Sequence, residues 1–286
     1  MKIGFVGLKM FCIFASKQKI MKNIFFISVI FFLFSGCSSV PVTGRKQLSI
    51  VSASEMNSLG ATSYKETLSS SKLSTNATQT AMIKRVGERI SKAVEQYMAE
   101  KNMSSVVSGF QWEFNLIDDP NTVNAWCMPG GKVAFYTGIL PVCQDEAGIA
   151  VVMGHEIAHA IANHSGERMS QELMVQLGGT ALSTALQQKT EQTQQLALTV
   201  FGVGTQLGAI LPYSRLHESE ADKMGLIFMA MAGYDPNEAP KFWERMKAAS
   251  GGSAPPQFLS THPSDTKRIT DLQAAMPEAM KYYKPQ

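Results

Sequence analysis

The chain has 286 residues, 45% of them hydrophobic, which is enough to bury the core of one domain with short appendages. Its formal net charge of +3 comes from the first 36 residues, which carry five lysines and no acidic residue; removing those five from the 26 basic residues leaves 21 against 23 acidic ones, a net charge of −2. A basic surface for nucleic acid is therefore excluded, and we expect no nucleic-acid partner.

Residues 1–36 have the layout of an export leader. A charged start at Met21–Asn23 precedes the run Ile24–Phe34, which is apolar apart from Ser28. Eleven residues can form the core of a signal peptide but are too few to span a bilayer as a helix. Because Met21 begins a complete signal by itself, we expect translation to start there.

The leader ends in Phe34-Ser35-Gly36-Cys37, which resembles a bacterial lipobox, although phenylalanine stands where leucine is usual. The resemblance implies cleavage before Cys37 and a diacylglycerol on its sulfur, which would anchor the protein to a membrane face. Ser38 and Ser39 follow in place of the aspartate that retains lipoproteins at the inner membrane. We therefore expect a periplasmic lipoprotein of the outer membrane; an ordinary signal peptide or an uncleaved anchor is the alternative.

Two segments with different composition follow the leader. Residues 37–54 are polar and contain proline and serine, which predicts a lipid-anchored tether, and residues 55–286 predict one domain. Apolar residues recur at every fourth position from 82 to 98, which predicts a helix. Residues 110–116 alternate between apolar and polar side chains, which predicts a half-buried strand.

A hairpin and a long helical region come next. Residues 124–127 and 132–140 flank Pro129-Gly130-Gly131, which predicts a hairpin. Helical periodicity dominates from Asp145 onward, and Asp235–Glu238 carries a helix start signal. Leu196–Leu211 is too short and too polar for a membrane span, so we expect a buried or lid-like helix there.

Two cysteines remain outside the leader and the anchor. Cys127 and Cys143 lie sixteen residues apart, on either side of the predicted hairpin. In an oxidising compartment they could form a disulfide. Two buried free thiols are the equal alternative, because the sequence does not give the Cα distance.

The pattern H-E-x-x-H occurs in the apolar stretch that begins at Gly148. On a helix, His155 and His159 lie one turn apart on the same face, and Glu156 stands beside them. This is the geometry of a zinc site with its general base: two imidazoles and one further ligand leave a fourth position for water, and the glutamate takes the proton of that water as it attacks a carbonyl. Without partners, burying these polar groups would cost several kcal/mol.

The third ligand must come from another segment. His164 falls half a turn out of phase with His155, so we expect a surface histidine or one behind the ligands. Glu218 and Asp222 lie one turn apart on a later helix, and Glu220 points elsewhere. Spacing alone allows either Glu218 or Asp222 to reach zinc, while the other would orient a ligating imidazole.

Several separated motifs together resemble peptidase family M48. They are the HEIAH sequence, the stretch from Ser214 to Asp222, VPVTGRKQLSIVS at 40–52, NAWCMPGGKVAFYTGIL at 124–140 and THPSDTKRI at 261–269. The similarity runs from Val40 to the C-terminus and is strongest to the branch of periplasmic lipoproteins related to mitochondrial Oma1. It implies an α+β, mainly helical zincin domain of the gluzincin type, with a small sheet beside the active-site helix.

The resemblance also implies a role for each site residue. His155, His159 and Glu218 become the ligands of one Zn²⁺, Glu156 the general base and Asp222 the orienting carboxylate. His262 matches a histidine that in some relatives sits over the metal. Arg215 either stabilises the developing oxyanion or forms a salt bridge within the acidic cluster.

A substrate strand is implied in the same way. An extended peptide would add to an edge strand beside the active-site helix, held by main-chain hydrogen bonds. The alternative is an internal strand whose side chains only pack. The residues concerned are Gly131, Lys132, Val133, Ala134, Phe135, Tyr136 and Thr137.

The sequence thus predicts a zinc-dependent endopeptidase that cleaves extended or misfolded envelope proteins, with polypeptides as substrates and the outer-membrane assembly machinery as an implied partner. A chaperone or assembly factor with a structural or capped zinc site is the first alternative. An exopeptidase is the second, and it would need an acidic anchor for a substrate amine.

Overall fold

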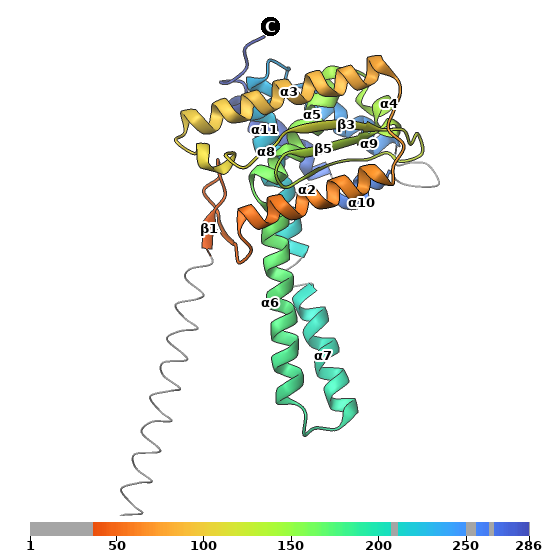
Figure 1. The fold of residues 1–286 in the computed structure, drawn as a ribbon. Helices are drawn as coiled ribbons and strands as arrows, with labels where there is room; N and C mark the ends of the chain where they lie inside the picture. The colour runs from red at the N-terminus through yellow and green to blue at the C-terminus, as the bar shows by residue number, and fades with distance from the viewer. Residues whose placement is uncertain (1–36, 207–210, 250–255, 263–265, 286) are drawn as a thin grey trace, which may run out of the picture.

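The structure is a computed structural model of the chain, and it describes residues 37–206, 211–249, 256–262 and 266–285 (Figure 1). It is mainly helical with two small sheets, which confirms the predicted fold class. In chain order its elements are β1 (Cys37–Ser39), β2 (Lys46–Leu48), α2 (Ala53–Ser69), α3 (Ala77–Glu100), η1 (Ser104–Val106), β3 (Glu113–Ile117), β4 (Ala125–Met128), β5 (Lys132–Tyr136), η2 (Thr137–Ile139), α4 (Leu140–Cys143), α5 (Glu146–Ile161), α6 (His164–Ala185), α7 (Glu191–Thr205), α8 (Leu211–Met231), α9 (Glu238–Ala249), α10 (Gln257–Thr261) and α11 (Thr266–Ala279). The predicted leader, residues 1–36, lies outside the described residues.

The main sheet has three strands in the order β3-β5-β4. β4 and β5 pair antiparallel around Pro129-Gly130-Gly131, as predicted, and β3 pairs with β5 in parallel. β5 is therefore the inner strand, and the expectation that Gly131–Thr137 is an edge strand is wrong. The edge beside α5 belongs to β4 instead.

Both faces of β5 are covered. Val133 and Phe135 face the main core, which includes residues of α3 and α5, while Ala134 packs in a second cluster with Tyr64 of α2. These three of the five residues of β5 are completely buried. A strand that is covered on both faces reads as a continuous apolar run, as this one does.

α5 carries the H-E-x-x-H sequence and is buried along almost its whole length. It begins where Asp145 accepts a hydrogen bond from the backbone N–H of Gly148 at 2.9 Å. α8 crosses it closely at Gly154 and Gly225: a Cβ atom on Gly225 would lie 2.9 Å from the backbone nitrogen of His155. Such contact requires glycine, and it brings α8 within reach of the α5 histidines.

α6 and α7 form a helical hairpin that extends away from the body of the protein (Figure 1). A buried or lid-like helix was expected over Leu196–Leu211. α7 has no buried residue, so the buried alternative is wrong for the described part of this segment, and the lid-like alternative stays a prediction. Leu196 and Val200 are 67% and 63% exposed. Within the described ranges, no helix has the length and apolar character that a membrane span requires.

The segment predicted as a tether is folded against the domain. β1 and β2 pair as a short antiparallel hairpin, and Val40, between them, is buried. Val51, just before α2, is buried as well. Cys127 and Cys143 are free thiols, so the disulfide considered for them is not formed; Cys143 is buried, as the other alternative expected, whereas Cys127 is half-buried.

Candidate metal centre

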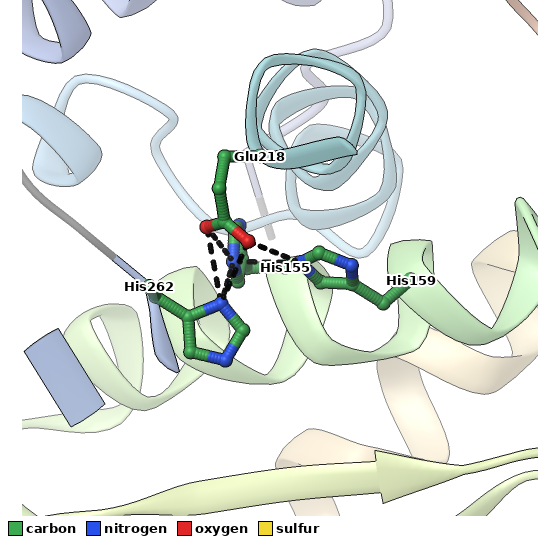
Figure 2. A group of neighbouring side chains, drawn as sticks. All are labelled: His155, His159, Glu218 and His262. Atoms are coloured by element: carbon green, nitrogen blue, oxygen red, sulfur yellow. Dashed lines mark hydrogen bonds and ion pairs between the residues drawn. The ribbon is translucent and has the colours of Figure 1, made fainter. Parts of the chain in front are cut away.

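Three segments far apart in the sequence bring their side chains to one point. His155 and His159 come from α5, Glu218 from α8 and His262 from the end of α10 (Figure 2). One nitrogen or oxygen atom of each residue lies within 4.8 Å of all the others. In the part of the chain that the structure describes, this is the one group of four that could hold a metal ion.

The distances fit a tetrahedral ion. Nε2 of His155 lies 3.1 Å from Nε2 of His159; the first nitrogen lies 3.3 Å from Oε2 of Glu218 and the second lies 3.3 Å from Oε1. Ligands about 2.0–2.1 Å from a tetrahedral zinc ion are about 3.3 Å from each other. Two imidazoles and a carboxylate with this spacing therefore fit Zn²⁺.

His262 contacts two of these three side chains and completes the group of four. Its Nδ1 lies 3.1 Å from Nε2 of His155 and 3.0 Å from Oε2 of Glu218. Figure 2 shows its ring on the side of the cluster opposite His159. This nitrogen therefore lies near the position of the fourth ligand in a three-residue zinc site.

Asp222 lies behind the cluster and not within it. Its Oδ1 is 2.9 Å from Nδ1 of His155, the ring nitrogen that faces away from Glu218. Of the two carboxylates that spacing left open, Glu218 thus reaches the shared point and Asp222 the outer nitrogen. A hydrogen bond there fixes which nitrogen of His155 carries the proton.

The sequence reasoning missed Arg268. Its guanidinium donates to both oxygens of Asp222, at 2.7 and 2.8 Å, and lies 3.1 Å from Oε2 of Glu218. It also stacks over Trp243, 3.5 Å from the ring centre. Arg268 belongs to the THPSDTKRI motif, so the family resemblance was the one signal that could have found it. The spacing of residues along the sequence gives no such signal.

Glu156 is buried, and its carboxylate points toward His262. Oε1 lies 3.3 Å from Nε2 of His262 in a geometry that makes no hydrogen bond with a described residue. Burial raises the pKa of Glu156, although the charges of His262 and His155 oppose this. A carboxylate with a raised pKa is a stronger base.

The pKa values of the three proposed ligands are shifted in different directions by their surroundings. Burial lowers the pKa of His159 well below its usual value despite the nearby Glu218, which favours the neutral form of the ring. Burial and Arg268 also lower the pKa of His155, but hydrogen bonds to Asp222 and Glu218 outweigh them and raise it to about 9. Burial works against ionisation of Glu218 too, yet His159 and His155 hold its pKa well below the usual range.

Arg215 is exposed, at the rim of a cavity of about 330 Å³ between α8 and α11 that Glu218 and Arg268 also line. Among the described residues it makes no ion pair with the acidic cluster. The salt bridge considered for it is therefore not seen, and its role toward an oxyanion stays a prediction.

Of the two positions expected for His164, the structure shows the one behind the ligands and not the one on the surface. α5 ends at Ile161, and Asn163 adopts a left-handed conformation with φ 55°, so the helical phase counted from His155 no longer applies. His164 is buried, and its Nδ1 lies 2.8 Å from Nδ1 of His159. Its other ring nitrogen, Nε2, lies 3.3 Å from Oε2 of Glu220, a residue for which the sequence predicted no role.

Comparison with known proteins agrees with the geometry. The profile described as peptidase family M48 matches residues 83–276. The mitochondrial metalloendopeptidase OMA1 of Schizosaccharomyces pombe is 36% identical over 253 residues, covering 87% of this chain and 69% of that protein. OMA1 of Saccharomyces cerevisiae is 32% identical, covering 88% and 74%. The beta-barrel assembly-enhancing protease of Escherichia coli is 32% identical over 164 residues, covering 56% and 33%.

The comparisons correct the expected location. The relatives that align with most of the chain are named as mitochondrial proteins, so the expectation of a periplasmic lipoprotein at the outer membrane is wrong. The local signal at Phe34-Ser35-Gly36-Cys37 is short and depends on few residues, whereas the alignment covers the folded domain. Lipid attachment at Cys37 stays a prediction.

Proposed function

Because this chain belongs to peptidase family M48, we propose that it is a zinc-dependent endopeptidase in which His155, His159 and Glu218 hold the metal. The observation that carries the proposal is the convergence of these three side chains, from two helices, at the spacing of a tetrahedral site. Its substrates are polypeptides, as for any endopeptidase.

We assign each residue one task in the hydrolysis. When bound by His155, His159 and Glu218, zinc would supply a Lewis acid that lowers the pKa of water toward about 7 and polarises the scissile carbonyl. Glu156 takes the proton of the attacking water on Oε1, and the raised pKa of this carboxylate suits it to do so and to pass the proton to the leaving amine. Asp222 keeps the proton of His155 on Nδ1, which leaves Nε2 free to bind the metal.

We propose that the substrate peptide binds as an added strand along the outer edge of β4. Tyr136 donates to the carbonyl of Asn124, so hydrogen-bonded pairs recur at every second residue and the backbone groups of Ala125 and Cys127 face away from β5. The N–H of Ala125 donates to Oδ1 of Asn124 at 3.0 Å, so a substrate strand would pair with the carbonyl of Ala125 and with Cys127. β4 packs against α5, which carries His155. A peptide added here would lie extended beside the metal, with little demand on its side chains.

A second function is favoured by His262, which completes the group of four at the site. If this side chain closes the site permanently, the protein is a chaperone or assembly factor with a structural metal. One of its relatives is named as a beta-barrel assembly-enhancing protease, which links the two activities in that protein.

Replacing Glu156 separates the two functions. A Glu156→Gln variant should keep one zinc per chain, measured by elemental analysis, and lose cleavage of casein, because the amide cannot accept the proton. Glu66→Gln, at an exposed position on α2, is the matched control and should keep both the zinc and the cleavage of casein. Unchanged biological activity of Glu156→Gln would favour the chaperone; wild-type cleavage by it would refute the assigned base. Peptides with free and blocked termini distinguish an endopeptidase from an exopeptidase.

A further inference from the structure

A buried chain of polar groups leads from His159 to the N-terminal hairpin. Nε2 of His159 faces the metal cluster, and its Nδ1 lies 2.8 Å from Nδ1 of His164. A neutral imidazole that binds metal through Nε2 carries its proton on Nδ1, so His159 donates and His164 accepts. His164 then carries its own proton on Nε2, which lies 3.3 Å from Oε2 of Glu220.

The carboxylate of Glu220 is held by the loop between β1 and β2. Arg45 donates to it from Nε at 2.8 Å, and Thr43 donates from its hydroxyl at 2.5 Å. Glu220 is 4% exposed. A carboxylate so deeply buried needs a partner cation, and Arg45 supplies one.

Arg45 holds a second carboxylate at the same time. Its two terminal nitrogens donate to the two oxygens of Glu167, at 2.8 and 2.7 Å. Glu167 also accepts from His217 at 2.8 Å, and the ring of His217 stacks on His164, with 4.1 Å between the centres. Arg45 therefore holds two groups that contact the ring of His164. Glu220 contacts a nitrogen at the edge of the ring, and His217, which Glu167 holds, stacks on its face.

The loop that presents Arg45 is itself firmly set. The backbone N–H of Val40 donates to the carbonyl of Arg45 at 2.8 Å, and Gly44 donates back to Val40 at 2.9 Å. Val42 has φ 71°, a conformation that a β-branched residue adopts only where its surroundings impose it. The side chain of Val40 is buried in the main core.

We propose that Arg45 is a positioning residue of the metal site: through Glu220 and Glu167 it holds His164 against His159 and so orients that ligand. The proposal rests on the proposed function, because it takes His159 as a metal ligand. It makes the β1-β2 hairpin a working part of the site, although Arg45 precedes His159 by more than a hundred residues.

The test measures zinc binding and not only activity. Arg45→Gln, Arg45→Lys and the control Arg85→Gln are compared by chelator competition for Zn²⁺ and by the absorption spectrum of the Co²⁺-loaded protein. Arg85 is a matched control because it also pairs with a glutamate, Glu146, but on the exposed surface. We expect Arg45→Gln to weaken zinc binding about 10–100-fold and to shift the Co²⁺ spectrum, Arg45→Lys to restore part of the affinity, and Arg85→Gln to behave as wild type.

A double-mutant cycle separates positioning from general stability. If Arg45 acts through His164, then His164→Gln should weaken zinc binding in the wild type but add little in the Arg45→Gln background. Should Arg45→Gln fail to fold, Arg45→Gln combined with Glu167→Gln and Glu220→Gln removes the buried charges it leaves behind, and the same measurements apply to it.

Two results would overturn the proposal: wild-type zinc affinity in folded Arg45→Gln or in the triple variant, or fully additive losses for Arg45→Gln and His164→Gln. Failure of the proposed function looks different, because the wild-type protein itself would then bind no zinc at the site, and both proposals would fall together.

Discussion

The carboxylate of Asp222 is the clearest place to perturb the site without touching a ligand. It is buried, and its Oδ1 lies 2.9 Å from Nδ1 of His155. Arg268 donates to both of its oxygens, at 2.7 and 2.8 Å. An Asp222→Asn variant offers one acceptor oxygen to these three donors and brings an NH₂ group among them.

Two losses follow from this change. A lost charge-assisted hydrogen bond in a buried position costs about 1.5–3 kcal/mol of unfolding free energy. Removing the partner that orients a ligating histidine lowers metal affinity about 10–100-fold, which is about 1.4–2.8 kcal/mol of binding free energy. We therefore expect Asp222→Asn to weaken zinc binding and to destabilise the metal-free protein by comparable amounts.

The assay is chelator competition for zinc, together with urea unfolding of the metal-free protein. Asp271→Asn is the matched control: its side chain is 39% exposed and pairs with Lys267 on α11. That pair should contribute less than about 1 kcal/mol. A folded Asp222→Asn protein with the zinc affinity of the wild type would refute the orienting role.

Four further predictions test other parts of the site. His262→Ala should raise or preserve casein cleavage, since the ring stands where water would bind; complete loss would make His262 catalytic instead. Gly225→Ala places a Cβ 2.9 Å from the backbone of His155 and should lower the unfolding free energy by about 1–3 kcal/mol, while Gly202→Ala, whose Cβ would meet nothing within 4 Å, should raise it by up to about 1 kcal/mol. Burial opposes ionisation of Glu167, but Arg45 and His217 lower its pKa from 4.5 to about 2. The ionised Glu167 therefore adds to the unfolding free energy above pH 4.5, and this contribution is lost as the pH falls toward 2. When the unfolding free energy is measured across this pH range, its decrease should be smaller in Glu167→Gln than in the wild type by roughly 2 kcal/mol, after allowance for solvent screening. A chelator should abolish casein cleavage, and added Zn²⁺ should restore it; cleavage that persists in the chelator would exclude a metal mechanism.

The sequence was most informative where the chemistry depends on one helix. The spacing of His155 and His159 placed both rings on one face, because α5 is regular from Glu146 to Ile161. Similarly, the periodicity of 82–98 predicted α3, and the residues around Pro129-Gly130-Gly131 predicted the β4-β5 hairpin. These are local features, set by hydrogen bonds between residues close in the chain.

What the sequence could not give depends on how distant segments meet. Nothing local tells that β3 pairs with the free side of β5, so the strand predicted as an edge is the inner one. The single left-handed residue Asn163 ended the helix and turned His164 inward, against the phase count. Arg45 and Arg268 reach the site from opposite ends of the chain, and only the folded structure pairs them with Glu220 and Asp222.

The choice of Glu218 over Asp222 as a metal ligand depended partly on local spacing and partly on how distant helices pack. Both occupy one face of α8, so spacing allowed either to reach the metal, and the family resemblance favoured Glu218. The close crossing at Gly154 and Gly225 gives a physical reason, since it sets Glu218 against the Nε2 atoms and leaves Asp222 beside Nδ1 of His155.

A crystal of the zinc-loaded protein, with anomalous diffraction recorded at the zinc edge, tests the metal assignment most directly. We predict one peak bonded to Nε2 of His155 and of His159 at about 2.0–2.1 Å and to a Glu218 oxygen at about 2.0–2.2 Å. A peak elsewhere in the molecule, or a Glu218 carboxylate turned away from the ion, would contradict it.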